Sequence, residues 1–253
     1  MNLLKNKLKN NAITLGGWIQ IPSIEIARIF SNVNGFDWVC IDMQHGAISN
    51  ETLAAMIAMI NSNRCIPIVR MEDPFTNRLP LYLDMGARGI IIPDIQSSST
   101  IKQNMGKTKY PPDGCRSFGY CAANNFGDYF DEYIKKANDD IVVIAQIEHI
   151  DALNSLSDIL CVDGLDGTFI GPLDLKGSVD INIDDVIFNR MLDKYRVTCE
   201  NCNKTMGMHI VEPSLKNINQ AKQDGYKMLA IGTDGIFLNS MSKKVVNHVF
   251  NNS

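Results

Sequence analysis

The chain has 253 residues, of which 45% are hydrophobic and 21% charged, and its net charge at pH 7 is −4. This composition is ordinary for a globular protein, and without a block of lysine and arginine the small negative charge argues against nucleic acid as the main partner. Apolar runs such as "GIIIP" are too short to span a bilayer, and the start "MNLLKNKLKNN" lacks the apolar region of a signal peptide. We therefore expect a cytoplasmic protein with no membrane partner.

Short β-rich segments alternate with helical segments along the chain. The predicted strands cover residues 14–20, 37–43, 66–70, 89–94, 141–148, 166–172, 206–211 and 228–234. Each is nearly continuously apolar, which is typical of a strand covered on both faces. After the second strand, four apolar residues fall on one face of a helix predicted over 50–63, with Ser49 or Asn50 as its cap.

Eight strands alternating with helices predict an α/β fold, a single-domain (β/α)8 TIM barrel over residues 1–253. Residues 1–13 form a short N-terminal extension, and about 236–250 form a C-terminal helix. An open doubly wound sheet has the same alternation, but no G-x-G-x-x-G follows the first strand and no P-loop motif is present. The longest connection, about 95–140, contains "KYPPDGCRSFGYCAANNFGDYF", which is typical of a structured functional loop.

The seven cysteines are predicted to be reduced structural thiols. Only Cys199 and Cys202 form a C-x-x-C, and no second pair is present to complete a zinc site.

Polar side chains gather where the predicted strands end. In a barrel these ends open on one face, where active sites lie. A barrel does not need polar side chains at these positions for its stability, and burying such side chains without partners costs free energy. They are Asp42, Gln44, His45, Arg70, Asp94, Gln96, Gln146, Glu148, Asp174, His209, Thr233 and Asp234.

Glu148 and Asp174 follow neighbouring strands, so their carboxylates can converge. Two carboxylates, with water and substrate oxygens in the remaining positions, suit a hard cation such as Mg2+ or Mn2+. On spacing alone, helix caps or ion pairs explain the two acids equally well.

Arg70 and His45 are candidates for substrate binding and proton transfer. The Arg70 guanidinium can bind both oxygens of a substrate carboxylate, or pair with a nearby acid. His45 is the candidate general base, because histidine gains and loses a proton near neutral pH and Asp42, three residues earlier, can orient its ring. A structural role for this histidine is an equal alternative.

The segments "DWVCIDMQHG", "PIVR", "KYPPDGCRSFG", "QIEHIDAL" and "DGTFIGPLDL" resemble, in order and spacing, the motifs of the HpcH/HpaI family of metal-dependent pyruvate aldolases. The resemblance runs from about residue 14 to 240. It implies a (β/α)8 barrel, often a hexamer built of dimers, with Mg2+, Mn2+ or Co2+ at the barrel mouth. It also implies an aldehyde-lyase that cleaves a 4-hydroxy-2-oxo acid to pyruvate and an aldehyde through a metal-stabilised pyruvate enolate.

Position by position, the resemblance implies that Glu148 and Asp174 are metal ligands, that Arg70 contacts the 2-oxo acid, and that His45 and Asp42 form the acid–base pair. It further implies a set of substrate-binding positions, namely Gln44, Asp84, Gln146, Gly171 and Leu173. Asp84 matches a position that in relatives reaches the active site of a neighbouring subunit. Gln44 departs from the Glu of many relatives, which removes a charge near the metal and bears on proton handling or acceptor choice.

Two other interpretations stay open. A related metal-enolate lyase would act on a CoA-ester, with Lys102, Lys107 and Lys109 as nearby basic residues, or on a phosphorylated substrate at "IGTDG". A solvated helix face and a turn explain these features too. A catalytically idle barrel with a binding role would be expected to lose its metal ligands or its base first, and all of them are present. The aldehyde, the physiological direction and the native metal are not specified by the sequence.

Overall fold

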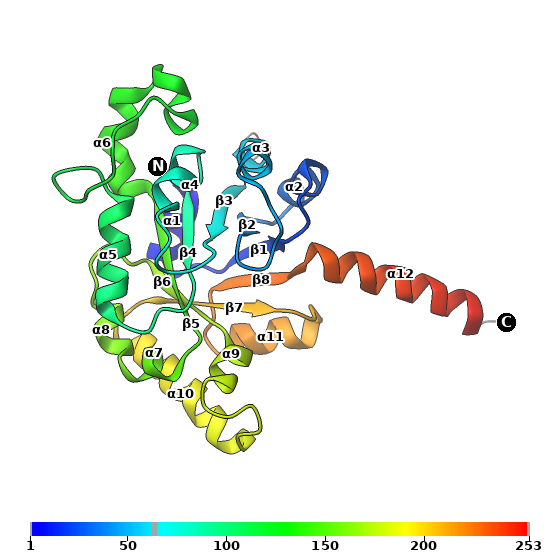
Figure 1. Cartoon of the computed structure of the whole chain (residues 1–253). Helices are drawn as coiled ribbons and strands as arrows, with labels where there is room; N and C mark the ends of the chain where they lie inside the picture. Colours follow the sequence, from blue (N-terminus) through cyan, green and yellow to red (C-terminus); the bar gives the residue numbers. More distant parts are fainter. Residues whose placement is uncertain (1, 62–64, 252–253) are drawn as a thin grey trace.

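The structure is a computed structural model that describes residues 2–61 and 65–251. Eight parallel strands close into a barrel in sequential order, as Figure 1 shows. The strands are β1 (Thr14–Ile19), β2 (Trp38–Asp42), β3 (Ile66–Arg70), β4 (Gly89–Ile92), β5 (Val142–Ile147), β6 (Gly167–Ile170), β7 (Thr205–Ile210) and β8 (Met228–Thr233). Each predicted strand overlaps an observed one, and the predicted (β/α)8 barrel is confirmed.

Helices lie between successive strands along the chain, and a last helix follows β8. They are α2 (Ile24–Ser31), α3 (Asn50–Asn61), α4 (Leu79–Asp84), α5 (Ser98–Thr108), α6 (Phe130–Asp140), α7 (Ile150–Asn154), α8 (Leu156–Leu160), α9 (Pro172–Gly177), α10 (Asp185–Asn201), α11 (Leu215–Gln223) and α12 (Asp234–Asn251). Ser49 caps α3 by accepting from the Thr52 N–H, and residues 62 and 63 at its predicted end lie outside the described residues. Among the described residues, no helix is both long and apolar enough to cross a membrane.

The connection between β4 and β5 is more helical than predicted. It contains α5, a 3-10 helix η1 (Ala122–Gly127) and α6, so the irregular part is confined to the segments around η1. In this part the Tyr110 and Phe118 rings stack with centroids 4.8 Å apart, and the buried Arg116 guanidinium lies 4.6 Å from the Tyr110 ring centroid. The Pro- and Gly-rich centre of this connection suggested a loop throughout. The two flanking helices, α5 and α6, are polar on most of their surface and were therefore not predicted.

Alternation along the strands decides which side chains face the barrel axis. Cys40, Ile68 and Ile144 belong to the apolar cluster inside the barrel, whereas their sequence neighbours pack against the helices. Successive strand residues point to opposite faces. The residues two positions later, Asp42, Arg70 and Gln146, therefore face inward at the carboxyl ends of β2, β3 and β5.

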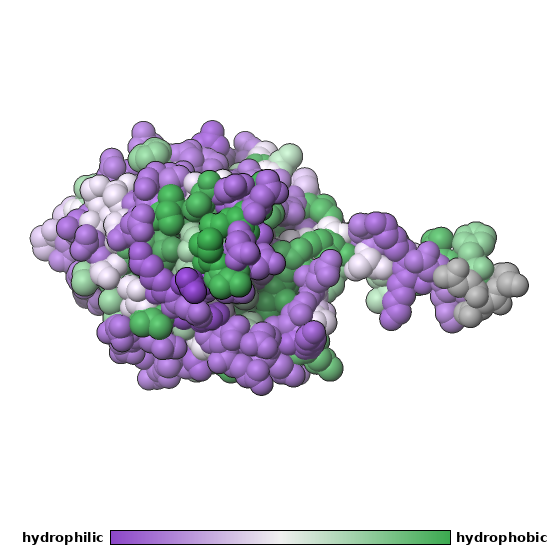
Figure 2. Space-filling view, turned by 90° about the horizontal axis from the view of Figure 1, so that it is seen from below, coloured by the Kyte–Doolittle hydropathy of each residue, from purple (hydrophilic) through white to green (hydrophobic). Residues whose placement is uncertain are grey.

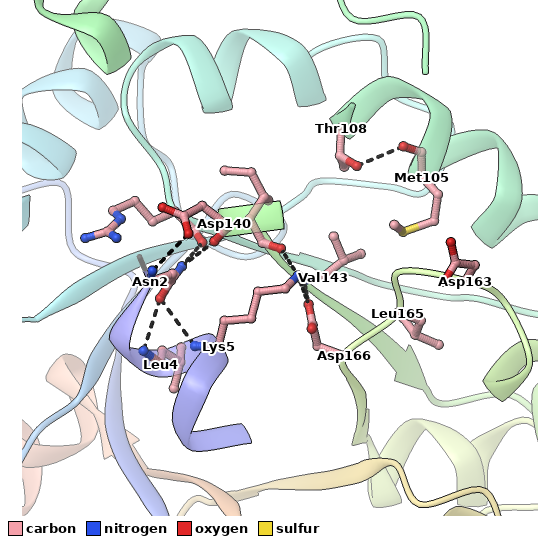
Figure 3. Close-up of polar contacts among 12 residues, drawn as sticks. Asn2, Leu4, Lys5, Met105, Thr108, Asp140, Val143, Asp163, Leu165 and Asp166 are labelled. Atoms are coloured by element: carbon pink, nitrogen blue, oxygen red, sulfur yellow. Dashed lines mark hydrogen bonds and ion pairs between the residues drawn. The ribbon is translucent and has the colours of Figure 1, made fainter. Parts of the chain in front are cut away.

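Helix α1 (Leu3–Lys9) packs at the opposite end of the barrel, and Figure 3 shows the polar contacts that hold it there. Leu4 and Leu8 belong to the apolar cluster of the barrel interior. The Lys5 ammonium donates to Asp166 Oδ2 at 2.9 Å and to the main-chain oxygen of Ile141 at 2.6 Å. The N-terminal extension is therefore a plug with a buried, fully paired charge.

A groove of about 670 Å³ lies beside this plug, and Lys109, Asp163, Asp166 and Lys204 are among its lining residues. Two of its lysines have partners inside the chain. Lys109 faces Asp163 at 4.0 Å, and Lys204 donates to the Leu165 main-chain oxygen at 2.6 Å. The groove is remote from the carboxyl ends of the strands, where barrel enzymes carry their active sites.

Candidate active site

Four side chains form one layer across the carboxyl end of the barrel. Trp18, Arg70, Gln146 and His209 are the last inward-facing residues of β1, β3, β5 and β7. In (β/α)8 barrels the interior is filled by such layers, each contributed by alternate strands. The top layer here holds two rings, a guanidinium and an amide in place of the aliphatic residues below it.

Asp42 and Arg70 form a buried, two-pronged ion pair. Register places Asp42 of β2 directly beside Arg70 of β3. Arg70 donates from Nε to Asp42 Oδ1 at 2.9 Å and from Nη2 to Oδ2 at 2.6 Å. Burial raises the pKa of the Asp42 carboxyl, but the hydrogen bonds and charge of Arg70 outweigh it, so the pKa is lowered.

The same carboxylate organises the loop that follows β2. Asp42 also accepts from the Gln20 side chain at 2.9 Å and from the main-chain N–H groups of Gln44 and His45 at 3.0 and 3.2 Å. Asp42 was predicted to orient the His45 ring. In the structure its carboxylate instead accepts from the main chain of the loop that carries His45. The His45 side chain is exposed and makes no hydrogen bond within residues 2–61 and 65–251.

Glu148 lies just beyond β5, with its side chain buried and held by two donors. Its Oε1 accepts from the Asp94 main-chain N–H and its Oε2 from Gln146 Nε2, both at 2.6 Å. Burial raises the pKa of the Glu148 carboxyl, the hydrogen bond from Asp94 opposes this, and the negative charge of Asp174 raises it further. The two acids are thus close enough to repel each other.

The surroundings of Glu148 fit a divalent cation. A cation would remove the repulsion from Asp174 and compensate the burial of the carboxylate. Gly171 allows its main chain to approach the Glu148 side chain closely, because a Cβ there would lie 2.9 Å from the Glu148 Cβ and 3.0 Å from its Oε2. Among the described residues no group of three or more His, Cys, Asp or Glu side chains could hold a metal ion, so a cation bound by Glu148 and Asp174 would take its remaining ligands from other groups.

Some of the buried polar side-chain atoms that lack a partner among the described residues lie at this end of the interior, and others, such as Asn104 Oδ1 and Tyr226 OH, lie elsewhere. Within the part of the chain that the structure describes, Trp18 Nε1, Gln44 Oε1, Gln146 Oε1 and His209 Nε2 are buried and have no hydrogen-bond partner. Native proteins pair most of their buried polar groups. Unpaired groups clustered at a barrel mouth are consistent with a site that a polar ligand completes.

The remaining predicted site residues divide into two groups. Gly171 and Asp174 flank the N-terminus of α9, and Leu173 between them is 71% exposed. Asp84 lies elsewhere, because α4 ends there, five residues before β4 begins, and its carboxylate accepts from Arg116 Nη2 at 2.6 Å. Within one copy of the chain Asp84 is not brought to the mouth.

Trp18 and Gln20 are mouth residues that the sequence did not single out, and His209 was noted only as polar. Counting in steps of two from the inward residues of β1 and β7 finds Trp18 and His209. Gln20 follows β1 directly and donates to Asp42. The signal was present, but it requires knowing which residues of each strand face inward.

Comparison with known proteins identifies similar sequences and folds. A sequence model described as HpcH/HpaI aldolase/citrate lyase matches residues 16–240. A 4-hydroxy-2-oxo-heptane-1,7-dioate aldolase of Salmonella dublin is 33% identical over 70% of this chain and 68% of its own, and a hydroxypyruvate/pyruvate aldolase of Roseovarius nubinhibens is 27% identical over 97% and 95%. A family structure from Burkholderia cenocepacia J2315 has the same fold, with a TM-score of 0.92 at 24% identity over 98% of this chain and 99% of its own.

Proposed function

The chain belongs to the HpcH/HpaI aldolase/citrate lyase family, a family of carbon–carbon lyases, and we propose that it reversibly cleaves a 4-hydroxy-2-oxo acid to pyruvate and an aldehyde. The observation that carries the proposal is the buried Glu148 carboxylate at the barrel mouth, whose pKa is raised by burial and by Asp174. This arrangement favours a bound cation, and cleavage next to a 2-oxo acid develops the negative charge that such a cation stabilises.

We propose that Glu148 and Asp174 hold Mg2+ or Mn2+, with Co2+ as a third candidate. When bound, the cation supplies Lewis acidity at the 2-oxo and carboxylate oxygens of the substrate. Gln146 fixes the Glu148 carboxylate by donating to Oε2, and its own buried Oε1 is left for the ligand. Gly171 and the main chain around Leu173 provide space for the substrate carboxylate.

Arg70 binds and orients the 2-oxo acid. Asp42 already takes Nε and Nη2, so Nη1 is the guanidinium nitrogen free for substrate within the described part of the chain. The fork predicted to grip two substrate oxygens is therefore shared between an internal carboxylate and the ligand. Because Asp42 locks the guanidinium, little side-chain freedom remains to be lost when substrate binds.

His45 takes the proton of the C4 hydroxyl during cleavage and returns it during synthesis. Its exposed ring stands on the loop that Asp42 anchors through main-chain hydrogen bonds, so Asp42 acts as a positioning residue for the base. We assign Gln44, on the same loop, to the contact with the incoming aldehyde; its buried Oε1 has no hydrogen-bond partner within the described residues.

The first test avoids the unidentified aldehyde. Purified protein is incubated with pyruvate and Mg2+ or Mn2+ in D2O, and loss of the methyl proton signal is followed by NMR. We expect exchange that stops with EDTA and falls about 10³-fold in Glu148→Gln. Asp163→Asn, in the groove at the other end, is the matched control and should exchange like the wild type. Absence of exchange with every divalent cation in folded protein would contradict the proposal.

The alternatives with CoA-ester or phosphorylated substrates gain no support from the geometry. Lys107 donates to the main chain of Thr76 and to Asn77, and Lys109 lines the remote groove. At the "IGTDG" turn, the Asp234 carboxylate accepts from the main-chain N–H groups of Gln20, Ile21 and Gly235. An acid already fills this position and would repel a phosphate.

We also propose that the protein is a homo-oligomer, a hexamer by family resemblance. Helix α12 stands away from the rest of the molecule (Figures 1 and 2). It exposes apolar side chains on the projecting part, including Leu238, Met241, Val245 and Phe250. An unsupported apolar helix is costly in water, and a second copy would cover it. Val245→Glu should lower the mass measured by light scattering, whereas Lys244→Glu on the same helix should not.

A further inference from the structure

Asp94 is a polar residue just after β4 that the proposed reaction does not use, and its main chain is left-handed, with a φ of 44°. Residues with a side chain rarely adopt this conformation, because the Cβ comes too close to the following carbonyl oxygen. Aspartate and asparagine tolerate it better than most residues, and glycine adopts it freely. A residue held in this conformation therefore has to be kept there by its surroundings.

The place of Asp94 in the fold differs from that of the other left-handed residues. Glycines apart, the described residues with a positive φ are Asn11, Asp94, Asn125, Phe126 and Asn203. Asn11 and Asn203 follow the helices α1 and α10, where a left-handed residue commonly ends a helix. Two others lie inside η1. Asp94 instead comes two residues after a strand, at the end of the barrel that carries the candidate cation site.

The turn at Asp94 holds the end of β5 through two main-chain N–H groups. The Asp94 N–H donates to Glu148 Oε1 at 2.6 Å, and the Ile95 N–H donates to the Gln146 main-chain oxygen at 3.4 Å. These two N–H groups belong to the peptide units on either side of the Asp94 Cα. A change of φ or ψ at Asp94 rotates one unit against the other. Leaving the left-handed region therefore weakens or breaks at least one of the two bonds.

The contact with Glu148 is made by the main chain of Asp94. Its side chain has another partner, since Oδ1 accepts from Gln96 Nε2 at 2.9 Å. The Glu148 carboxylate has a donor on each oxygen, because its Oε2 accepts from Gln146 Nε2 at 2.6 Å. The Asp94 N–H and the Gln146 amide together fix the plane of this carboxylate.

Resting on the proposed function, we propose that Asp94 is a positioning residue whose left-handed main chain aims its N–H at Glu148 and so fixes that carboxylate for Mg2+ or Mn2+. A carboxylate that is already fixed has little rotational freedom left to lose when the cation binds. Groups that orient a ligating carboxylate in this way contribute about 10- to 100-fold to metal affinity. The cost of the left-handed conformation thus has a return in the orientation of a cation ligand.

The test compares Mn2+ affinity among four variants that all lack the Asp94 charge and differ in how readily the main chain becomes left-handed. Asp94→Gly and Asp94→Asn favour this conformation, whereas Asp94→Ala resists it and the β-branched Asp94→Val resists it most. Dissociation constants are measured by EPR of free Mn2+ without pyruvate. They should be similar in the first two variants and about 10- to 100-fold higher in Asp94→Val, with Asp94→Ala between. Because alanine is smaller than asparagine, lack of space cannot produce this order.

Asn203→Val is the matched control, because Asn203 is also left-handed, with a φ of 51°, but lines the groove at the other end of the barrel. Urea titration should show both valine variants destabilised, whereas only Asp94→Val should bind Mn2+ more weakly. If Asp94→Val does not fold, Asp94→Ala against Asp94→Asn makes the same comparison. Equal dissociation constants in the folded Asp94 variants, or an equal loss of affinity in Asn203→Val, would overturn the proposal. A wild type that binds no Mn2+ would instead overturn the cation site on which the proposed function rests.

Discussion

The two ends of the barrel treat buried polar groups in opposite ways. At the amino end, the buried Lys5 and Asn2 find all their partners inside the chain, in Asp166 and in main-chain oxygens (Figure 3). At the carboxyl end, Gln146 and His209 keep buried atoms without a partner in the described residues. Burying an unpaired group costs about 1–3 kcal/mol. The amino end is therefore internally paired, whereas the carboxyl end carries this cost, as expected if the proposed ligand completes it.

The same substitution at each end tests this contrast most strongly. Asp42→Asn leaves Arg70 without its counter-ion, and Asp166→Asn does the same to Lys5. Breaking a buried ion pair costs about 3–5 kcal/mol, so urea titration should show both variants destabilised. Pyruvate exchange, measured where both are folded, should fall only in Asp42→Asn. A comparable fall in Asp166→Asn would show that the amino end is not purely structural.

Replacing the proposed base, His45, should have the opposite effect to breaking the amino-end ion pair: turnover should fall while stability is unchanged. His45 is exposed and packs against little, so His45→Ala should leave the free energy of unfolding within about 0.5 kcal/mol of wild type. General acid–base catalysis contributes about 10²–10⁴-fold, and turnover of the 4-hydroxy-2-oxo acid should fall by that factor. The kinetics of aldol cleavage give the turnover, and a urea titration gives the free energy of unfolding. Full turnover in His45→Ala would remove the residue from the mechanism.

Features of the two ends that depend on the local apolar pattern were predictable from the sequence, whereas features that depend on strand register or on distant contacts were not. Strands covered on both faces leave continuous apolar runs, so all eight strands and the polar set at their ends were predictable. An ion pair of Arg70 with a nearby acid was one of the two interpretations left open, and it is the one that the structure shows. The sequence did not identify Asp42 as that acid, because proximity along the chain suggested His45 as the partner of Asp42, whereas register between β2 and β3 sets Asp42 beside Arg70. The layer of Trp18, Arg70, Gln146 and His209 likewise depends on which strand residues face inward. The plug of α1 was predicted only as an extension, since its partner Asp166 is far away in sequence.

Acid should affect the carboxyl end through Asp42. Its pKa is lowered in the folded protein, because the interactions with Arg70 outweigh burial. A carboxyl whose folded pKa lies below its unfolded pKa binds fewer protons when folded. Its stabilising contribution is therefore fully present above the ordinary pKa near 3.8 and is lost as pH falls through the lower folded value.

The wild type should then lose stability relative to Asp42→Asn on acidification, because the asparagine cannot titrate. Urea titrations at pH 7 and at about pH 3 give the difference between the two proteins at each pH. The difference should be large at pH 7 and smaller in acid. A difference that is independent of pH would mean that Asp42 stabilises the mouth as a hydrogen-bond acceptor for the loop rather than as the counter-ion of Arg70.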